Sequence, residues 1–111
     1  MRITMVKKIL ADGSPCRKCA DVETRLHDGG HLSRIYRVVI ADERDPGSEG
    51  TRLAQRHNVD LAPFFIVEQD DGTTRVYTIF LRFLREVLQA EASAADEVRE
   101  IMERGPNLDF L

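Results

Sequence analysis

The chain has 111 residues, of which 42% are hydrophobic and 32% charged, and its formal net charge is −3 at pH 7. This length and composition predict one soluble globular core and exclude both a disordered chain and a fibrous repeat. No apolar run approaches the ~20 residues of a membrane span, and Lys7 and Lys8 interrupt the apolar start of the chain, where a secretory signal would stay apolar. We therefore expect a cytoplasmic protein without membrane contact.

The charge is distributed unevenly along the chain. Residues 1–56 carry eleven Lys or Arg and eight Asp or Glu, whereas residues 57–111 carry five and eleven. Binding to nucleic acid needs clustered basic residues that face phosphate, so the acidic second half disfavours a nucleic-acid partner. Only two cysteines are present, Cys16 and Cys19, and they are too close in sequence to bridge distant segments as structural disulfides do. Their role must be local.

The first part of the chain predicts a strand, a turn and a helix. Residues 3–10 are mostly apolar with a β-branched bias, and residues 12–15 break this run, so we predict a buried strand followed by a turn. Ser14 is a good N-cap and Pro15 suits the first helical position. A helix is therefore expected over residues 15–28.

This predicted helix has one apolar face. Cys19, Val22 and Leu26 are spaced by three and four residues, which places them together against a sheet. Cys16 lies one turn earlier, at the start of the helix.

The middle of the chain predicts a second strand, a short helix and a hairpin. Residues 33–41 have a buried-strand composition, and Ser48 and Asn58 are suitable residues to begin and end the helix. Two apolar segments, 64–67 and 75–77, flank an Asp-Gly turn, which is a strong hairpin signal.

The remaining residues predict two more helices. Thr78 is the expected N-cap of a helix with a broad apolar stripe over 79–88, and Ser93 with Asp96 resembles a capping pair for an acidic helix that ends at Arg104 before Gly-Pro. The order β-α-β-α-β-β-α predicts an α/β fold with a mixed sheet, in which the first two strands are parallel and the hairpin strands antiparallel.

We predict one domain over residues 1–91 and an acidic helical extension over residues 92–111. Two interpretations of the apolar residues in this extension remain open: they fold back on the domain, or they bind a second copy or another protein. These residues are Val98, Ile101, Met102, Leu108, Phe110 and Leu111.

The segment Cys16-Arg17-Lys18-Cys19 carries the main functional signal. Two intervening residues let both sulfurs meet across one helical turn, so a dithiol and a disulfide can interconvert with little backbone movement. Unpaired amides at a helix start favour a thiolate, and Arg17 and Lys18 add positive charge. We interpret Cys16 as the nucleophile and Cys19 as the resolving thiol of a thiol–disulfide oxidoreductase.

The CxxC helix start after a strand, together with Ala62-Pro63 before the strand at 64–67, resembles the thioredoxin superfamily, in particular its compact glutaredoxin-sized members. The resemblance covers about residues 3–91. It implies a thioredoxin-like fold, with a four-stranded sheet in the order 2-1-3-4 and helices on both faces. It also implies a cis-proline at Pro63 beside the active-site sulfurs and substrate contact at Ala62.

The resemblance further implies that no cofactor is needed, and that substrate is bound around the CxxC helix start. The expected substrate is a disulfide-containing protein or a low-molecular-weight thiol compound, and the expected electron donor is glutathione or a reductase. The implied substrate-binding positions are Pro15, Arg17, Lys18, Ala62 and Pro63.

Two other interpretations of the cysteine pair remain. The string Cys16, Cys19, His27, His31 has zinc-like composition, but eight residues of one helix separate Cys19 from His27 by ~12 Å, too far to share a metal. Zinc or an iron–sulfur cluster would then require ligands from two chains. The other alternative is a non-catalytic adaptor with two packed thiols.

Overall fold

A four-stranded sheet and its helices make up residues 1–78, the first of two compact units in the computed structural model. The second unit begins at Ile79, and the structure describes the chain as far as Arg104. The predicted domain boundary near residue 91 stays a prediction. None of the described helices is long and apolar enough to cross a membrane.

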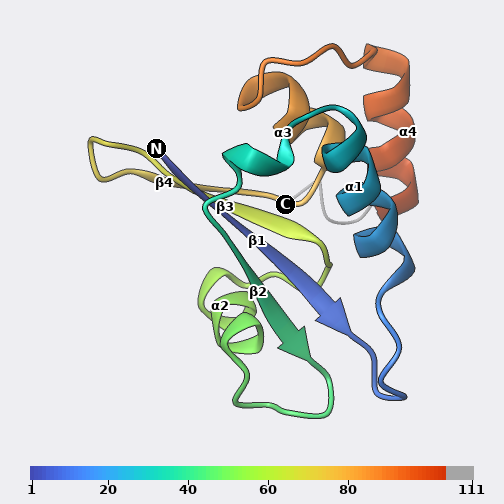
Figure 1. Ribbon diagram of the computed structural model, residues 1–111, viewed down its shortest axis with the longest axis vertical. Coiled ribbons are helices and arrows are strands. Elements are labelled where there is room, and N and C mark those ends of the chain that lie inside the picture. Colours follow the sequence, from blue (N-terminus) through green and yellow to red (C-terminus); the bar gives the residue numbers. More distant parts are fainter. Residues whose placement is uncertain (105–111) are drawn as a thin grey trace. The chain divides into compact units, whose positions relative to one another are not determined.

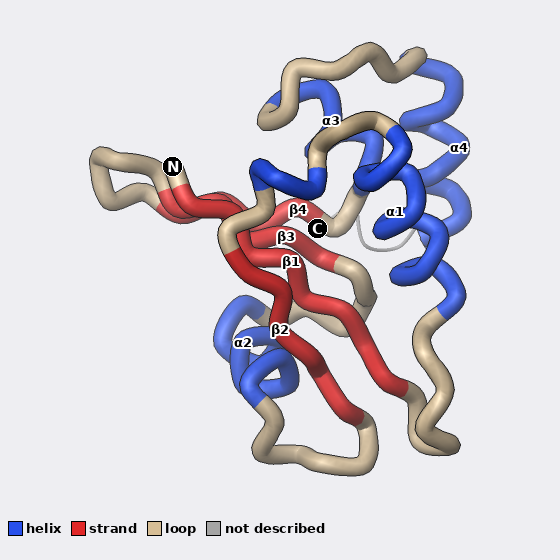
Figure 2. The backbone as a smooth tube through the Cα atoms, in the orientation of Figure 1, coloured by secondary structure: helices blue, strands red, loops and turns tan. Residues whose placement is uncertain are grey.

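The strands of the first unit lie in the order β2-β1-β3-β4 (Figure 2). β1 runs parallel to β2 and antiparallel to β3, and β3 and β4 form the antiparallel hairpin. The predictions of an α/β fold and of a mixed sheet in the order 2-1-3-4 are therefore confirmed. The elements are β1 (Arg2–Ile9), α1 (Arg17–Asp28), the short 3-10 helix η1 (Leu32–Arg34), β2 (Arg37–Asp42), α2 (Glu49–His57), β3 (Phe64–Glu68) and β4 (Thr74–Tyr77).

Helix α2 covers one face of the sheet. Leu53 and Ala54 of α2 pack on a cluster of buried strand residues, which comprises Val6, Val39, Ala41, Phe64 and Ile66. Gly50 makes this packing close, because a Cβ atom there would lie 2.3 Å from the backbone nitrogen of Ala41. Helix and strand backbones are in direct contact at this point.

Helix α1 lies on the opposite face of the sheet (Figure 1). Because neighbouring strand residues alternate between faces, Met5 and Phe65 point away from the α2 side, and both are fully buried. Lys7 shares their face and forms an ion pair of 3.0 Å with Glu23 of α1. The predicted apolar face of α1 is buried as expected, with Cys19, Val22 and Leu26 at 2% exposure or less.

The predicted start of α1 is wrong by two residues. Cys16 rather than Ser14 is the N-cap, and Pro15 lies outside the helix in an isolated bridge to Ile9. The hydroxyl and amide of Ser14 both donate to the Asp12 carboxylate, so they serve the turn and not the helix. Pairing of this loop with the end of β1 overrides the local capping preference.

The start of β2 also differs from the prediction, whereas the end of α2 agrees with it. β2 begins at Arg37 and not at residue 33, because residues 32–34 form η1. Asn58 ends α2 in the left-handed conformation, with φ 55° and ψ 46°, as predicted. Gly72 in the hairpin turn has φ 91°, a conformation that glycine adopts without a steric penalty.

The second unit contains α3 (Phe80–Glu86) and α4 (Ala94–Arg104). Ile79 is the N-cap of α3, so the prediction that Thr78 caps this helix is wrong. The predicted cap of α4 is confirmed, because the Ser93 hydroxyl accepts the Asp96 amide at 3.0 Å. The predicted helix stop at 105–106 and the apolar residues at 108–111 lie outside the described residues.

Candidate active site

Cys16 occupies the N-cap of α1, and a loop over residues 10–15 connects it to the end of β1. Its backbone amide donates to the Lys8 carbonyl at 3.1 Å, which ties the helix start to the strand. Its sulfur accepts the Cys19 amide, with a Sγ–N distance of 3.4 Å. The Cys16 side chain therefore takes the capping position that an Asp or Ser normally fills.

Cys19 lies one turn further along α1 and is buried, with 2% exposure, whereas Cys16 is partly exposed. The Cys19 sulfur accepts the amide of Lys8, with a Sγ–N distance of 3.4 Å. Both cysteines are free thiols in the structure. A molecule in solution can thus reach Cys16, while Cys19 is accessible mainly to its neighbours.

The segment before β3 also borders the site, in addition to α1 and Lys8 of β1. The Cys16 thiol donates to the Ala62 carbonyl, with a Sγ–O distance of 3.8 Å. The Ala62–Pro63 peptide bond is cis, the isomer that the family resemblance implies, and the Pro63 side chain is fully buried. The Cys16 sulfur therefore lies between a backbone donor on α1 and a backbone acceptor from the segment preceding β3.

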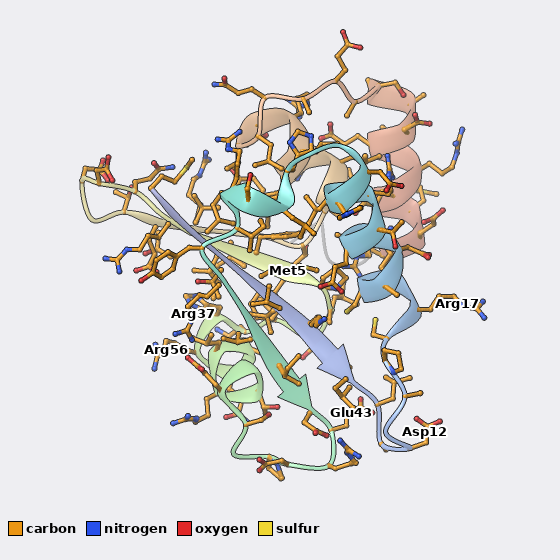
Figure 3. All side chains as sticks on the ribbon, viewed as in Figure 1. Met5, Asp12, Arg17, Arg37, Glu43 and Arg56 are labelled. Atoms are coloured by element: carbon orange, nitrogen blue, oxygen red, sulfur yellow. The ribbon has the colours of Figure 1, made fainter. Side chains whose placement is uncertain are left out.

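The charged residues of the CxxC segment lie on the outside of the site. Arg17 is exposed and points into solvent (Figure 3), and Lys18 is partly exposed. The first turn of α1 contains no acidic residue. Pro15 is exposed just before the helix. The two cysteines and Ala62 are therefore brought together, whereas the Arg17 side chain is directed outward.

Asp12 is the acidic residue nearest in sequence before Cys16, but its carboxylate serves the turn. The hydroxyl and amide of Ser14 hold the pKa of Asp12 below its ordinary value by hydrogen bonding to the ionised form. Asp12 is fully exposed at this turn, so its charge is directed to solvent and to Ser14.

Lys8 is the residue of the site that sequence analysis missed. Its carbonyl accepts the Cys16 amide and its amide donates to the Cys19 sulfur, so one peptide segment positions both cysteines. The side chain takes no part, since its ammonium group lies 3.6 Å from Glu43. The signal available in the sequence was that the CxxC segment follows the end of a predicted strand after one tight turn.

The residues considered for a zinc site do not form a metal-binding cluster in the described part of the chain. Within residues 1–104, no three His, Cys, Asp or Glu side chains are arranged to hold a metal ion. His27 lies in the last turn of α1, with its side chain 76% exposed, at the opposite end of the helix from Cys16.

Comparisons of the chain with protein-family models, with curated protein sequences and with solved structures find no match. The geometry of the cysteine site is therefore the basis for assigning a function.

Proposed function

We propose that the protein is a cytoplasmic thiol–disulfide oxidoreductase with a thioredoxin-like fold. One observation carries the proposal: a partly exposed Cys16 caps α1 with its sulfur, and a buried Cys19 follows one turn later on the same helix. This arrangement separates a thiol that an external disulfide can reach from a thiol that reacts within the molecule. An inert pair of packed thiols would not need this difference in exposure.

The proposed reaction exchanges sulfur–sulfur bonds. The Cys16 thiolate attacks one sulfur of the substrate disulfide, the substrate S–S bond breaks, and the departing sulfur takes a proton from solvent. Cys19 then loses its proton and attacks the Cys16 sulfur of the mixed disulfide, which releases the second substrate thiol. The substrate gains two electrons and two protons, and Cys16 and Cys19 are oxidised to a disulfide. An external thiol reductant, glutathione or the dithiol of a reductase, restores the pair.

Substrate contact is assigned to the residues around Cys16. The backbone of Ala62 is the closest such group, since its carbonyl already contacts the Cys16 sulfur. Pro63 supports this segment from the interior, while Pro15, Arg17 and Lys18 surround the helix start. Arg17 and Lys18 add positive charge around the helix start, where a substrate would approach Cys16.

A disulfide-reduction assay tests the proposal with Cys16→Ser and Cys19→Ser as a matched pair. The wild-type chain should reduce a protein disulfide when glutathione or a thioredoxin-type reducing system is supplied. Cys16→Ser should fall to the background rate, because the accessible nucleophile is lost. Absence of wild-type activity with both reducing systems would end the oxidoreductase interpretation.

Trapping of the intermediate tests the assignment of the two roles. Cys19→Ala should accumulate a mixed disulfide between Cys16 and the substrate, visible by mass spectrometry, because no second thiol remains to resolve it. Cys16→Ala should accumulate none, because Cys19 is buried. If the two variants gave the reverse result, the nucleophile would be Cys19.

A specific observation favours a second candidate, a non-catalytic adaptor. Val98 and Met102 lie one turn apart on α4 and are 57% and 63% exposed, which is unusual for large apolar side chains. In this alternative the double variant Val98→Ser and Met102→Ser loses a protein partner, while both cysteine variants bind it normally. Loss of binding in the cysteine variants would reject the adaptor.

A further inference from the structure

A second cleft lies on the α2 side of the sheet, at the edge far from the cysteines. Its volume is about 430 Å³, and it lies between α2 and the strand ends that carry Arg2, Arg37 and Glu68. Thr4 and Ile66 are buried beneath it, at 6% and 5% exposure. The cleft therefore has a closed floor and a charged rim.

Two of the basic residues at this cleft have partners. Arg37 forms an ion pair with Glu49 at the start of α2, so these two charges neutralise each other. The guanidinium carbon of Arg2 lies 5.5 Å from the centre of the Tyr36 ring, a cation–π distance that leaves the positive charge of Arg2 intact. Figure 3 shows Arg37 and Arg56 at the same part of the molecule.

The other two basic residues come from the last turn of α2. Arg56 and His57 both line the cleft, and neither has an ion-pair partner among residues 1–104. The ordinary explanation is that basic residues at a helix C-terminus stabilise the helix dipole. The helix dipole does not explain why Arg2, from the start of β1, lines the same cleft. Glu68 is the remaining carboxylate at the rim.

We propose that this cleft binds a small phosphate monoester. After the Arg37–Glu49 pair is set aside, two guanidinium groups and one imidazole face a single carboxylate, Glu68. Two guanidinium forks match the charge and the several acceptor oxygens of a phosphate better than they match a single carboxylate. The volume accommodates a phosphate with a small organic group attached.

The cleft is independent of the proposed disulfide chemistry. Arg2 begins β1, whereas Lys8, near the other end of this strand, contacts both cysteines, and six steps of extended chain separate Arg2 from Lys8 by about 20 Å. A ligand held by Arg2 and Arg56 therefore does not reach the cysteine sulfurs. Its binding should be unaffected by Cys16→Ser.

NMR titration of the full chain tests the proposal, with inorganic phosphate, phenyl phosphate and acetate as probes. Both phosphate compounds should produce saturable shifts of the amides of Thr4, Arg37 and His57, with those of Cys16 and Cys19 unchanged. Acetate should bind at least about tenfold more weakly, since it carries one charge and two oxygens. Absence of saturable shifts at the cleft up to about 10 mM phosphate, or equal binding of acetate, overturns the proposal.

Charge variants separate binding from structural damage. Arg56→Gln should weaken phosphate binding about tenfold, by loss of hydrogen bonds to a charged group. Arg52→Gln is the matched control, because Arg52 is exposed on the same helix and does not line the cleft. Glu68→Gln should tighten binding several-fold, because it removes the opposing carboxylate. Equal weakening by Arg52→Gln, or no tightening by Glu68→Gln, contradicts the proposed site.

Discussion

The two units of the chain are stabilised in different ways. In residues 1–78, apolar side chains fill both faces of the sheet, and the charged groups remain at least partly exposed. In the described part of the second unit, two glutamates are buried, Glu97 at 8% and Glu100 at 4% exposure. A sheet with a helix on each face encloses an apolar core, whereas α3 and α4 also use buried carboxylates to connect one helix to the other.

Each buried glutamate has a separate structural role. Glu100 of α4 accepts the amides of Phe80 and Leu81, at the start of α3, where a helix supplies no backbone acceptor of its own. Glu97 binds the guanidinium groups of Arg82 and Arg85, with N–O distances of 2.9 to 3.0 Å. Helix α3, which is only seven residues long, is therefore capped by a neighbouring helix and not by its own preceding residue.

The largest expected effect tests the apolar side of this comparison. Phe64→Ala should reduce the free energy of unfolding of the first unit by about 4 kcal/mol, because it leaves a cavity in the cluster beneath α2. The measurement is urea unfolding followed through NMR signals of β1 and β3. Val38→Ala on β2 is the control, since Val38 is 41% exposed and should cost less than about 1 kcal/mol. Similar losses for the two variants would show that the cluster does not dominate stability.

The next effect tests the carboxylate cap of α3. Glu100→Ala should cost the second unit about 3 kcal/mol, because two amides lose a charged acceptor in a buried position. Hydrogen exchange at the Phe80 and Leu81 amides should accelerate strongly. Glu103→Ala, an exposed change on the same helix, should leave these amides protected. If the Phe80 and Leu81 amides exchanged as slowly in Glu100→Ala as in the wild type, Glu100 would not be the cap of α3.

The smallest of these effects is a pH dependence of the second unit that comes from Glu97. Hydrogen bonds from Arg85, joined by those from Arg82, lower the pKa of Glu97 below its ordinary value of about 4.5. Since the folded pKa is the lower one, the stabilisation is complete above about pH 4.5 and declines as the pH falls through the folded value. Urea unfolding followed through α3 signals at pH 6 and about pH 3.5 should show this decline.

Glu97→Gln is the control for this pH dependence. This variant has a side chain of the same length without the carboxylate, so Glu97 should no longer contribute to the loss of stability at low pH. If the wild type and Glu97→Gln lost stability equally between the two pH values, the Arg85–Glu97 pair would not be the source of the pH dependence.

Several features followed from the order of residues alone. The apolar runs of β1 and β3, the spacing of Cys19, Val22 and Leu26, and the Asp-Gly hairpin lead to a mixed sheet with α1 on it. These signals are local, since side-chain alternation and helical spacing are properties of the chain itself. The start of the CxxC helix was also located to within two residues.

Helix caps were predicted less well where distant groups compete with local ones. Ser14 is a good N-cap by type, but its hydroxyl bonds Asp12, and Cys16 is positioned by the Lys8 carbonyl. Thr78 is likewise suitable by type, yet the amides of Phe80 and Leu81 at the start of α3 donate to Glu100, about twenty residues further along the chain. Capping preferences describe a residue in isolation, while the folded chain selects among all acceptors that reach the same amide.

Residue type and spacing were enough to predict the strands, the apolar face of α1 and two thiols one turn apart. Two arrangements became visible only in the folded chain: Lys8 positions both cysteines, and Arg2 and Arg56 line one cleft. Such contacts join residues far apart in the chain, and they exist only after the strands have paired and the helices have packed.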